Sequence, residues 1–310
     1  MMLAPTSPRR HRIAVATMVL CALLWSTAGV VTRQLEHAGG FELTFWRSLA
    51  CLLFVCGYLV VTSRSRWLAV VTASGWPGVV SGVMWAIMFT CFMIALVLTT
   101  VAKTLVVLAI APLLTALLAW LVLGERIAGR TWAAITAAGA GMVWMVRDGL
   151  QADAGTGSLW GMLIAAGVPL ASAINMKRQQ ARVDLVPAVL IGAIISCLAM
   201  LPLILPMQAS GRDILLLALL GVFQLGLPCV LMIGAARHLS PQETALLALL
   251  EVVFGPLWAW LGAGERPADA TLHGGALILA ALVANEVLAG RRPAPGAAVQ
   301  AVRTTKSKPA

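Results

Sequence analysis

Glu251 is the residue whose type and position most clearly suggest chemistry, because it is a carboxylate inside an otherwise almost wholly apolar run, TALLALLEVVFGPLWAWLGAGER at residues 244–266. At helical spacing it shares one face with Thr244, Ala248, Gly255 and Trp258. An ionised side chain facing lipid at this depth costs several kcal/mol. We therefore expect this face to line a cavity and bind substrate, with Glu251 contacting a polar or cationic group and exchanging a proton near neutral pH. The alternative is a neutral carboxyl group that only hydrogen-bonds a neighbouring helix.

Polar and aromatic residues inside other apolar runs are further candidates for the same cavity. They are Trp25, Ser26, Trp85, Phe89, Phe92, Ser172, Asn175 and Gln224. Polar side chains also join membrane helices to one another, and aromatic stripes more often pack than bind, so both alternatives stand. Arg47 lies within one turn of the expected outer end of its run, where an anchoring role is favoured over substrate binding.

Two prolines inside apolar runs predict breaks in the helices that carry the site. Proline cannot donate a backbone hydrogen bond and clashes with the carbonyl group four residues earlier. Pro256 should therefore kink its helix and free the carbonyl group of Val252, close to Glu251. Pro112 should do the same for Leu108.

The composition places these residues in a membrane protein. Of the 310 residues, 60% are hydrophobic and only 11% are charged, and the mean hydropathy is +0.93. The net charge of +10 could indicate nucleic-acid binding in a soluble chain, but here the basic residues occupy short connections and both ends, so no nucleic acid is expected. The six cysteines have no metal or redox spacing. No metal motif, nucleophile motif or phosphate-binding loop is present either, so we expect neither an enzyme nor a cofactor.

The apolar runs divide into ten segments of membrane-spanning length. They are 13–32, 43–62, 75–98, 100–123, 131–146, 157–176, 185–205, 214–236, 241–262 and 271–290. With the N-terminus inside, sixteen Lys and Arg residues fall on the cytoplasmic side and six on the outer side. This asymmetry predicts a multi-pass protein of the bacterial inner membrane with both termini, 1–12 and a disordered tail at 291–310, in the cytoplasm.

The run that contains Glu251 has a counterpart 140 positions earlier, TLVVLAIAPLLTALLAWLVLGER at 104–126, and both share AWL-x-x-GER. Spans four and nine are thus equivalent members of two five-helix halves, 13–146 and 157–290. Because five is odd, the halves cross the membrane in opposite directions. The sequence predicts an all-α integral membrane protein of ten transmembrane helices arranged as two inverted five-helix repeats, which is typical of alternating access.

Several short motifs resemble the ten-span EamA-type branch of the drug/metabolite transporter superfamily. They are Leu24-Trp25-Ser26, Phe45-Trp46-Arg47, and Pro112 thirteen residues before Glu125 in Gly124-Glu125-Arg126. The family often carries Glu-Pro in the second half, where this chain has Glu251-Val252 and its proline one turn later. The resemblance implies a secondary transporter of small metabolites. Leu24-Trp25-Ser26-Thr27 is also similar to the opening of bacterial aromatic amino-acid exporters.

These observations predict outward transport of amino acids, aromatic ones included, with the bilayer, the solute and protons as partners. The alternatives are a channel-like facilitator and an exporter of cationic drugs. Four residues at the ends of spans four and nine are expected to bracket the helices or act as gates: Glu125, Arg126, Glu265 and Arg266. Small residues spaced by four are expected to hold the halves together or form a dimer contact, so monomer and homodimer both stay open. They are Ala133, Ala137 and Gly141, and Ala276, Ala280 and Ala284.

Overall fold

The computed structural model describes residues 8–123, 128–151, 156–179, 186–239 and 241–290, and all regular elements in these ranges are helical. The first half contains α1 (Pro8–Ser26), α2 (Ala28–Thr32), α3 (Gly40–Ser63), η1 (Arg64–Arg66), α4 (Trp67–Ala73), α5 (Gly75–Leu98), α6 (Val101–Leu108), α7 (Ala111–Leu123) and α8 (Gly129–Gln151). The second half contains α9 (Thr156–Ala165), α10 (Gly167–Gln179), α11 (Val186–Met200), η2 (Leu201–Leu203), α12 (Gly211–Leu219), η3 (Leu220–Gly226), α13 (Leu227–Ala235), α14 (Pro241–Ala248), α15 (Leu250–Ala263) and α16 (Asp269–Gly290). The predicted all-helical class is confirmed. The predicted disordered tail lies outside the described residues.

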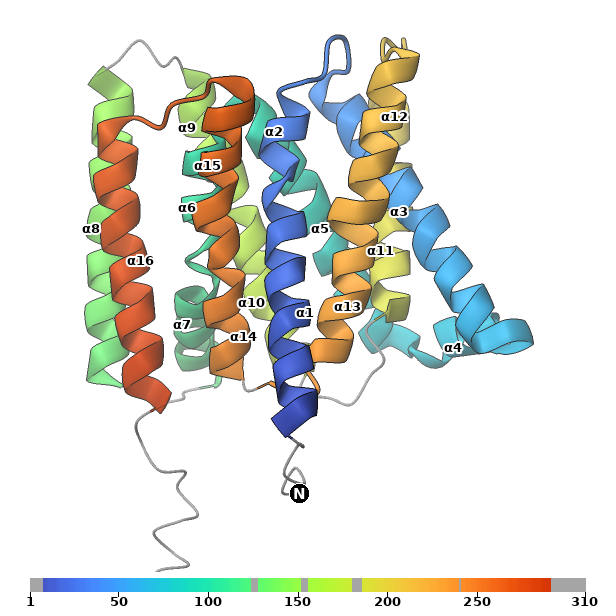
Figure 1. Cartoon of the computed structure of the whole chain (residues 1–310), viewed down its shortest axis with the longest axis horizontal. Helices are drawn as coiled ribbons and strands as arrows, with labels where there is room; N and C mark the ends of the chain where they lie inside the picture. Colours follow the sequence, from blue (N-terminus) through green and yellow to red (C-terminus); the bar gives the residue numbers. More distant parts are fainter. Residues whose placement is uncertain (1–7, 124–127, 152–155, 180–185, 240, 291–310) are drawn as a thin grey trace, which may run out of the picture.

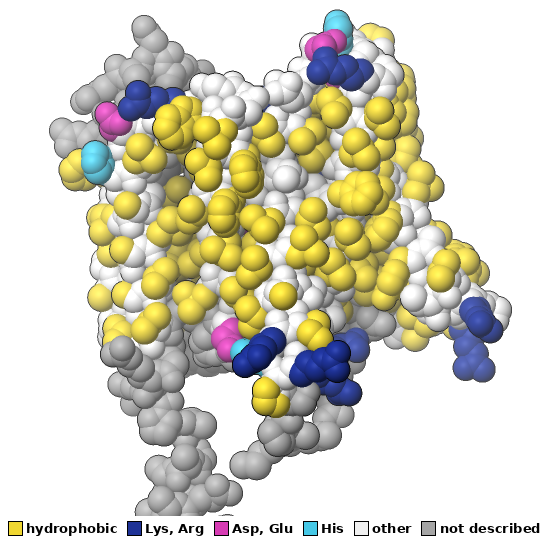
Figure 2. All heavy atoms as spheres, viewed as in Figure 1, with side chains coloured by type: hydrophobic (Ala, Val, Ile, Leu, Met, Phe, Trp, Pro, Cys, Tyr) yellow, Lys and Arg dark blue, Asp and Glu magenta, His cyan; other side chains and the backbone are white. Residues whose placement is uncertain are grey.

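Seven helical segments of the described chain are long and apolar enough to cross a membrane, and shorter apolar stretches occur at Leu159–Ser172 and Asp269–Asn285. The face shown in Figure 2 has a broad hydrophobic belt, while charged side chains gather at its upper and lower edges. This is the surface of a multi-pass membrane protein, because lipid accepts apolar side chains and the charged ones reach water. The count of ten spans stays a prediction.

The helices run between two edges of the molecule (Figure 1). At the lower edge in that view α1 begins and α16 ends, and we call it the terminal edge. At the opposite edge lie α2, the start of α12 and the end of α15. Helices of the two halves pack directly on each other: α11 lies against α5 and α3, α1 against α13 and α15, and α16 against α8.

Several helices are interrupted between the edges. α6 ends at Leu108 and α7 begins at Ala111, so this break immediately precedes Pro112. α14 ends at Ala248 and α15 begins at Leu250, whereas Pro256 lies inside α15. The break in the second repeat thus falls at Leu249 rather than at the predicted proline. In a tightened turn at this break, the Val252 amide donates to the Leu249 carbonyl oxygen at 3.0 Å. Pro256 removes one backbone hydrogen bond, and α15 continues as a helix despite this loss.

The α8–α16 contact corrects part of the small-residue prediction. A Cβ atom at Gly141 would lie 2.8 Å from the Gly274 carbonyl oxygen, so the two backbones approach closely there. Ala134 and Ala138, one position along from the predicted alanines of α8, are the buried ones. On α16 the predicted residues Ala276, Ala280 and Ala284 are exposed. They do not hold the halves together, because α16 turns Gly274, Ile278 and Leu282 inward instead.

Candidate functional site

The polar centre of the molecule is built around Arg47, two turns inside α3. α3 begins at Gly40, three residues earlier than expected, so the side chain of Arg47 is only 2% exposed. The predicted anchoring of Arg47 at the membrane surface is therefore wrong. Arg47 Nε donates to Gln224 Oε1 at 3.1 Å, and its guanidinium carbon lies 5.5 Å from the centre of the Phe92 ring. Nη1 of Arg47 is buried and has no hydrogen-bond partner among the described residues.

Gln224 reaches Arg47 from η3, a seven-residue π-helix between α12 and α13. A π-helix widens the turn, is rare, and often occurs at functional sites. Gly221 allows η3 to lie against α3, since a Cβ atom there would be 2.4 Å from the Arg47 carbonyl oxygen. Gln224 is 3% exposed and also donates through Nε2 to the Trp25 carbonyl oxygen at 3.2 Å. It thereby joins α1, α3 and η3 across the two halves.

Glu251 lies in the first turn of α15, two residues after the break at Leu249. Its side chain is half-buried and interacts electrostatically with Arg47. No hydrogen bond joins Glu251 to another residue that the structure describes, and none of the ion pairs in those ranges includes Arg47. The two halves therefore bring opposite charges close together inside the bundle without direct contact between them.

Trp25, Ser26 and Trp258 form a second set of contacts at the same junction. Trp258 Nε1 donates to Ser26 Oγ at 3.0 Å, and Ser26 Oγ donates to the Leu23 carbonyl oxygen at 2.7 Å. Trp258 also stacks on Phe254, with ring centres 6.0 Å apart. Trp25 and Trp258 are half-buried, so part of each indole stays accessible. α1 and α15 thus place two half-buried indoles at the junction of the two halves.

Other predicted site residues have different surroundings. Trp85 and Phe89 are buried in a core cluster with α11, and Trp85 lies against Gly192, so their environment is that of packing. Gly255 lies where α15 crosses Leu105 and the Ser26 backbone. Thr244 is half-buried on α14, and Ser172 is half-buried on α10. The side chain of Asn175 lies outside the described residues.

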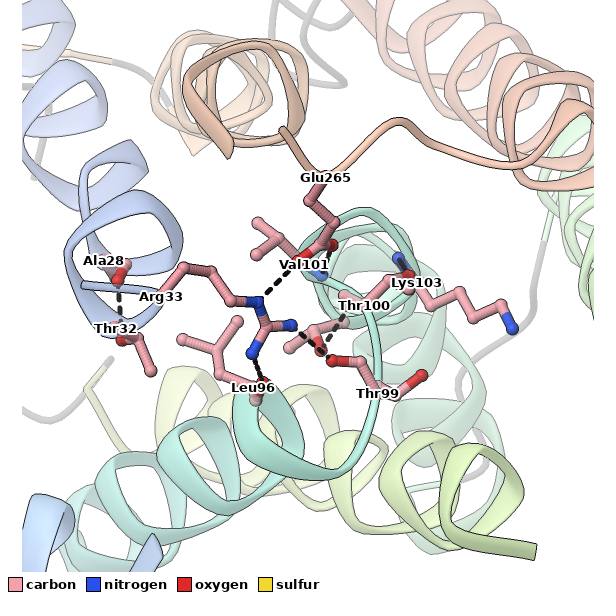
Figure 3. A network of polar contacts seen from close by, with 10 residues as sticks. Ala28, Thr32, Arg33, Leu96, Thr99, Thr100, Val101, Lys103 and Glu265 are labelled. Carbon is pink, nitrogen blue, oxygen red and sulfur yellow. Dashed lines mark hydrogen bonds and ion pairs between the residues drawn. The ribbon is translucent and has the colours of Figure 1, made fainter. Parts of the chain in front are cut away.

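A network of polar contacts joins the two halves at the opposite edge (Figure 3). Arg33, just after α2, donates from Nε to Glu265 Oε2 at 2.5 Å. Its other nitrogens donate to the carbonyl oxygens of Leu96 at 2.7 Å and Thr99 at 2.9 Å, at the end of α5. Glu265 Oε1 accepts from the Val101 amide, the first residue of α6, at 2.6 Å. We call these five residues the Arg33–Glu265 clasp.

Gly264 positions Glu265 for this role. It adopts the left-handed conformation, with φ of 68°, and ends α15. Glycine is favoured at such an end because it has no Cβ atom to clash. The next residue, Glu265, then lies over the ends of α5 and α6. The equivalent Glu125 and Arg126 lie outside the described residues, and Arg266 is exposed.

Two further carboxylates tie loops of the two halves together at the same edge. Glu42, near the start of α3, accepts from the amides of Gln208 and Ala209, each at 2.9 Å. Asp213, in the first turn of α12, accepts from the amides of Glu36 at 3.0 Å and His37 at 3.1 Å. At the terminal edge, an ion pair between the halves joins His11 and Glu243 at 2.9 Å, and both side chains are well exposed. Charge-assisted contacts therefore join the halves at both edges of the described chain.

Sequence reasoning missed Arg47 and Arg33 as functional residues. A signal for Arg47 was present, because Thr44, Arg47, Ser48 and Cys51 share one helical face and are all buried at 0–2% exposure. For Arg33 the sequence offers no comparable signal, since its partner Glu265 is 232 positions away.

The fold and this site can now be set beside known proteins. No protein with a curated description matches the chain. A solved structure titled only "Crystal structure of protein" superposes with a TM-score of 0.63 at 23% identity, over 90% of this chain and 98% of the other, and shows the fold alone. The model of the EamA-like transporter family matches twice, at residues 12–147 and 156–285, which together span most of the chain and show that it carries two copies of the family's repeat. The chain therefore belongs to the EamA-like transporter family, whose members move small solutes across membranes.

Proposed function

We propose that the chain exports amino acids, aromatic ones included, across the bacterial inner membrane by alternating access between its two repeats. The observation that carries this proposal is that Arg47 from the first half and Glu251 from the second half interact electrostatically inside the bundle while Arg47 Nη1 stays buried without a described partner. A solute bound between the halves contacts both, so it can couple to their relative movement. One cation and one carboxylate suit a solute that carries both charges.

The state of the opposite edge supports the direction of transport. With both termini in the cytoplasm, the Arg33–Glu265 clasp lies on the outer side and holds that side closed. A protein resting in this state receives its solute from the cytoplasm and must break the clasp to release it. Glu251 can take up a proton during the cycle, since it is not locked in a hydrogen bond to another described residue.

Counterflow in proteoliposomes tests the proposal. Vesicles loaded with an unlabelled amino acid should accumulate the same labelled amino acid transiently, with saturable flux, from a panel of aromatic and aliphatic amino acids and cationic drugs. A carrier shows this exchange because the unlabelled solute inside competes with the entered label for the same site and slows its exit. A channel shows flux without counterflow, which would reject alternating access. Preference for the cationic drugs over every amino acid would favour a drug exporter, an outcome that Arg47 opposes by charge repulsion.

A further inference from the structure

Arg47 is a buried cation with fewer described hydrogen bonds than its guanidinium group can donate. Only Nε of its guanidinium group has a described hydrogen bond, and that partner is the neutral amide of Gln224. Nη1 is buried without a partner, and no described carboxylate forms an ion pair with Arg47. Burying a charged group is costly unless it is paired and hydrogen-bonded. Such a group, 2% exposed at the junction of the two halves, is therefore suited to a partner that arrives with the solute.

The surroundings of Arg47 fix the orientation of its planar group. Gln224 holds Nε from one side, and the ring of Phe92 lies against the guanidinium carbon at 5.5 Å. The close approach of Gly221 to the Arg47 backbone keeps η3, and with it Gln224, in place. A guanidinium group held in this way offers its remaining donors in a fixed direction. Carboxylates and phosphates both match this donor pattern, and the carboxylate is the one that an amino acid carries.

We infer that Arg47 binds the carboxylate of the transported solute through Nη1, while Glu251 faces the solute's ammonium group. The site therefore selects zwitterions, in which both charges are present on one small molecule. This inference rests on the proposed function and makes it more specific, because it assigns each end of the amino acid to one half of the protein. An amine that lacks the carboxylate offers Arg47 no anionic partner. Its ammonium group and the guanidinium group of Arg47 also repel each other.

Thermal stabilisation of the purified full-length protein in detergent tests the inference without requiring transport. The probes are two matched series: phenylalanine, phenylalaninamide and phenethylamine, and leucine, leucinamide and isoamylamine. We expect at least one amino acid to raise the melting temperature, with its amide and amine about tenfold or more weaker in apparent affinity, since each lacks the charge that Arg47 would bind. Stabilisation by no amino acid, or equal stabilisation by amine and amino acid, overturns the inference.

Three variants test whether Arg47 carries this preference. In Arg47→Gln the three probes of a series should bind with affinities within about threefold of one another, because the carboxylate loses a charge-assisted partner. Arg66→Gln, a matched change at an exposed arginine of η1, should keep the wild-type preference. If Arg47→Gln does not fold, Arg47→Lys keeps the charge and should retain a weakened preference. Full preference in a folded Arg47→Gln protein overturns the assignment.

Failure of this inference and failure of the proposed function have different signatures. Counterflow of amines and amino acids at equal rates leaves the transporter standing and removes Arg47 as the carboxylate receptor. Arg47-dependent binding of amino acids without any counterflow leaves the site standing and removes the carrier mechanism.

Discussion

At the scale of single residues, the proposal makes Glu251 the group that exchanges a proton during transport. Glu251→Gln keeps size and hydrogen bonding but removes the ionisable proton. We expect this variant to insert and fold normally, yet to lose most counterflow and any dependence of flux on pH across the neutral range. Asp269→Asn, at the exposed start of α16, is the matched control and should behave like the wild type. Wild-type flux and pH profile in Glu251→Gln would leave the carboxyl group a purely structural role.

Two tryptophans of the predicted aromatic face should respond differently to truncation. Trp85 is buried in the core beside α11. Trp85→Ala should therefore lower the free energy of unfolding by about 3 kcal/mol and reduce the transport of aromatic and aliphatic solutes equally. Trp25 is half-buried beside Gln224, and Trp25→Ala should weaken uptake of an aromatic solute more than that of a small aliphatic one. Melting curves and competition assays separate the two effects. Equal loss for both solutes in Trp25→Ala would assign Trp25 to packing as well.

At the scale of elements, the π-helix η3 determines whether Gln224 reaches Arg47. In Gly221→Ala the new Cβ atom would lie 2.4 Å from the Arg47 carbonyl oxygen and 2.6 Å from the Ala50 Cβ atom, so η3 must move away from α3. We expect a loss of about 1–3 kcal/mol in stability and a marked loss of transport. Gly234→Ala on α13 meets no atom within 4 Å and should change neither. Full transport by Gly221→Ala would show that close packing of η3 on α3 is dispensable.

The clasp makes an element-scale prediction of its own. Arg33→Gln and Glu265→Gln should each lower the melting temperature, and the double variant should lose less than the sum, because the two residues bond directly. The coupling should be of order 1–3 kcal/mol for a charge-assisted contact. Additive losses in this double-mutant cycle would mean that Arg33 acts through the α5 carbonyl groups alone.

The elements show what sequence reasoning can reach. Apolar runs, a repeat at a fixed offset and proline positions suffice to predict the helices, the break beside Pro112 and a carboxylate inside the ninth apolar run. They misplace the second break, which falls at Leu249 and puts Glu251 in the first turn of α15. These sequence patterns do not reveal η3. A π-helix differs from an α-helix by a widened turn, and the residues of η3 have no pattern that distinguishes the two. The sequence patterns also do not give the burial of Arg47, because it depends on where α3 begins. They do not give the Arg33–Glu265 pair either, because it depends on how the two halves pack.

At the scale of the whole molecule, the charge asymmetry of the sequence predicts the orientation in the membrane. Single-cysteine reporters at Ser65 and Thr304 should both be labelled only from the cytoplasm. Ser65 lies in η1, directly before α4, and α4 lies toward the terminal edge in Figure 1. Labelling of either site from outside would reject the ten-span topology. Labelling of Ser65 from outside would also reverse the assignment of the clasp to the outer side and, with it, the proposed direction of transport.

The central claim is that the two halves open one edge while they close the other. Spin-label distances test it most directly, with one pair at His37 and Ala268 on the clasp edge and one at Ser65 and Arg237 on the terminal edge, all exposed positions. With a saturating concentration of an amino acid that shows counterflow, we predict that the clasp-edge distances lengthen as the terminal-edge distances shorten. Distances that do not change at either edge, or that lengthen at both edges together, would contradict alternating access.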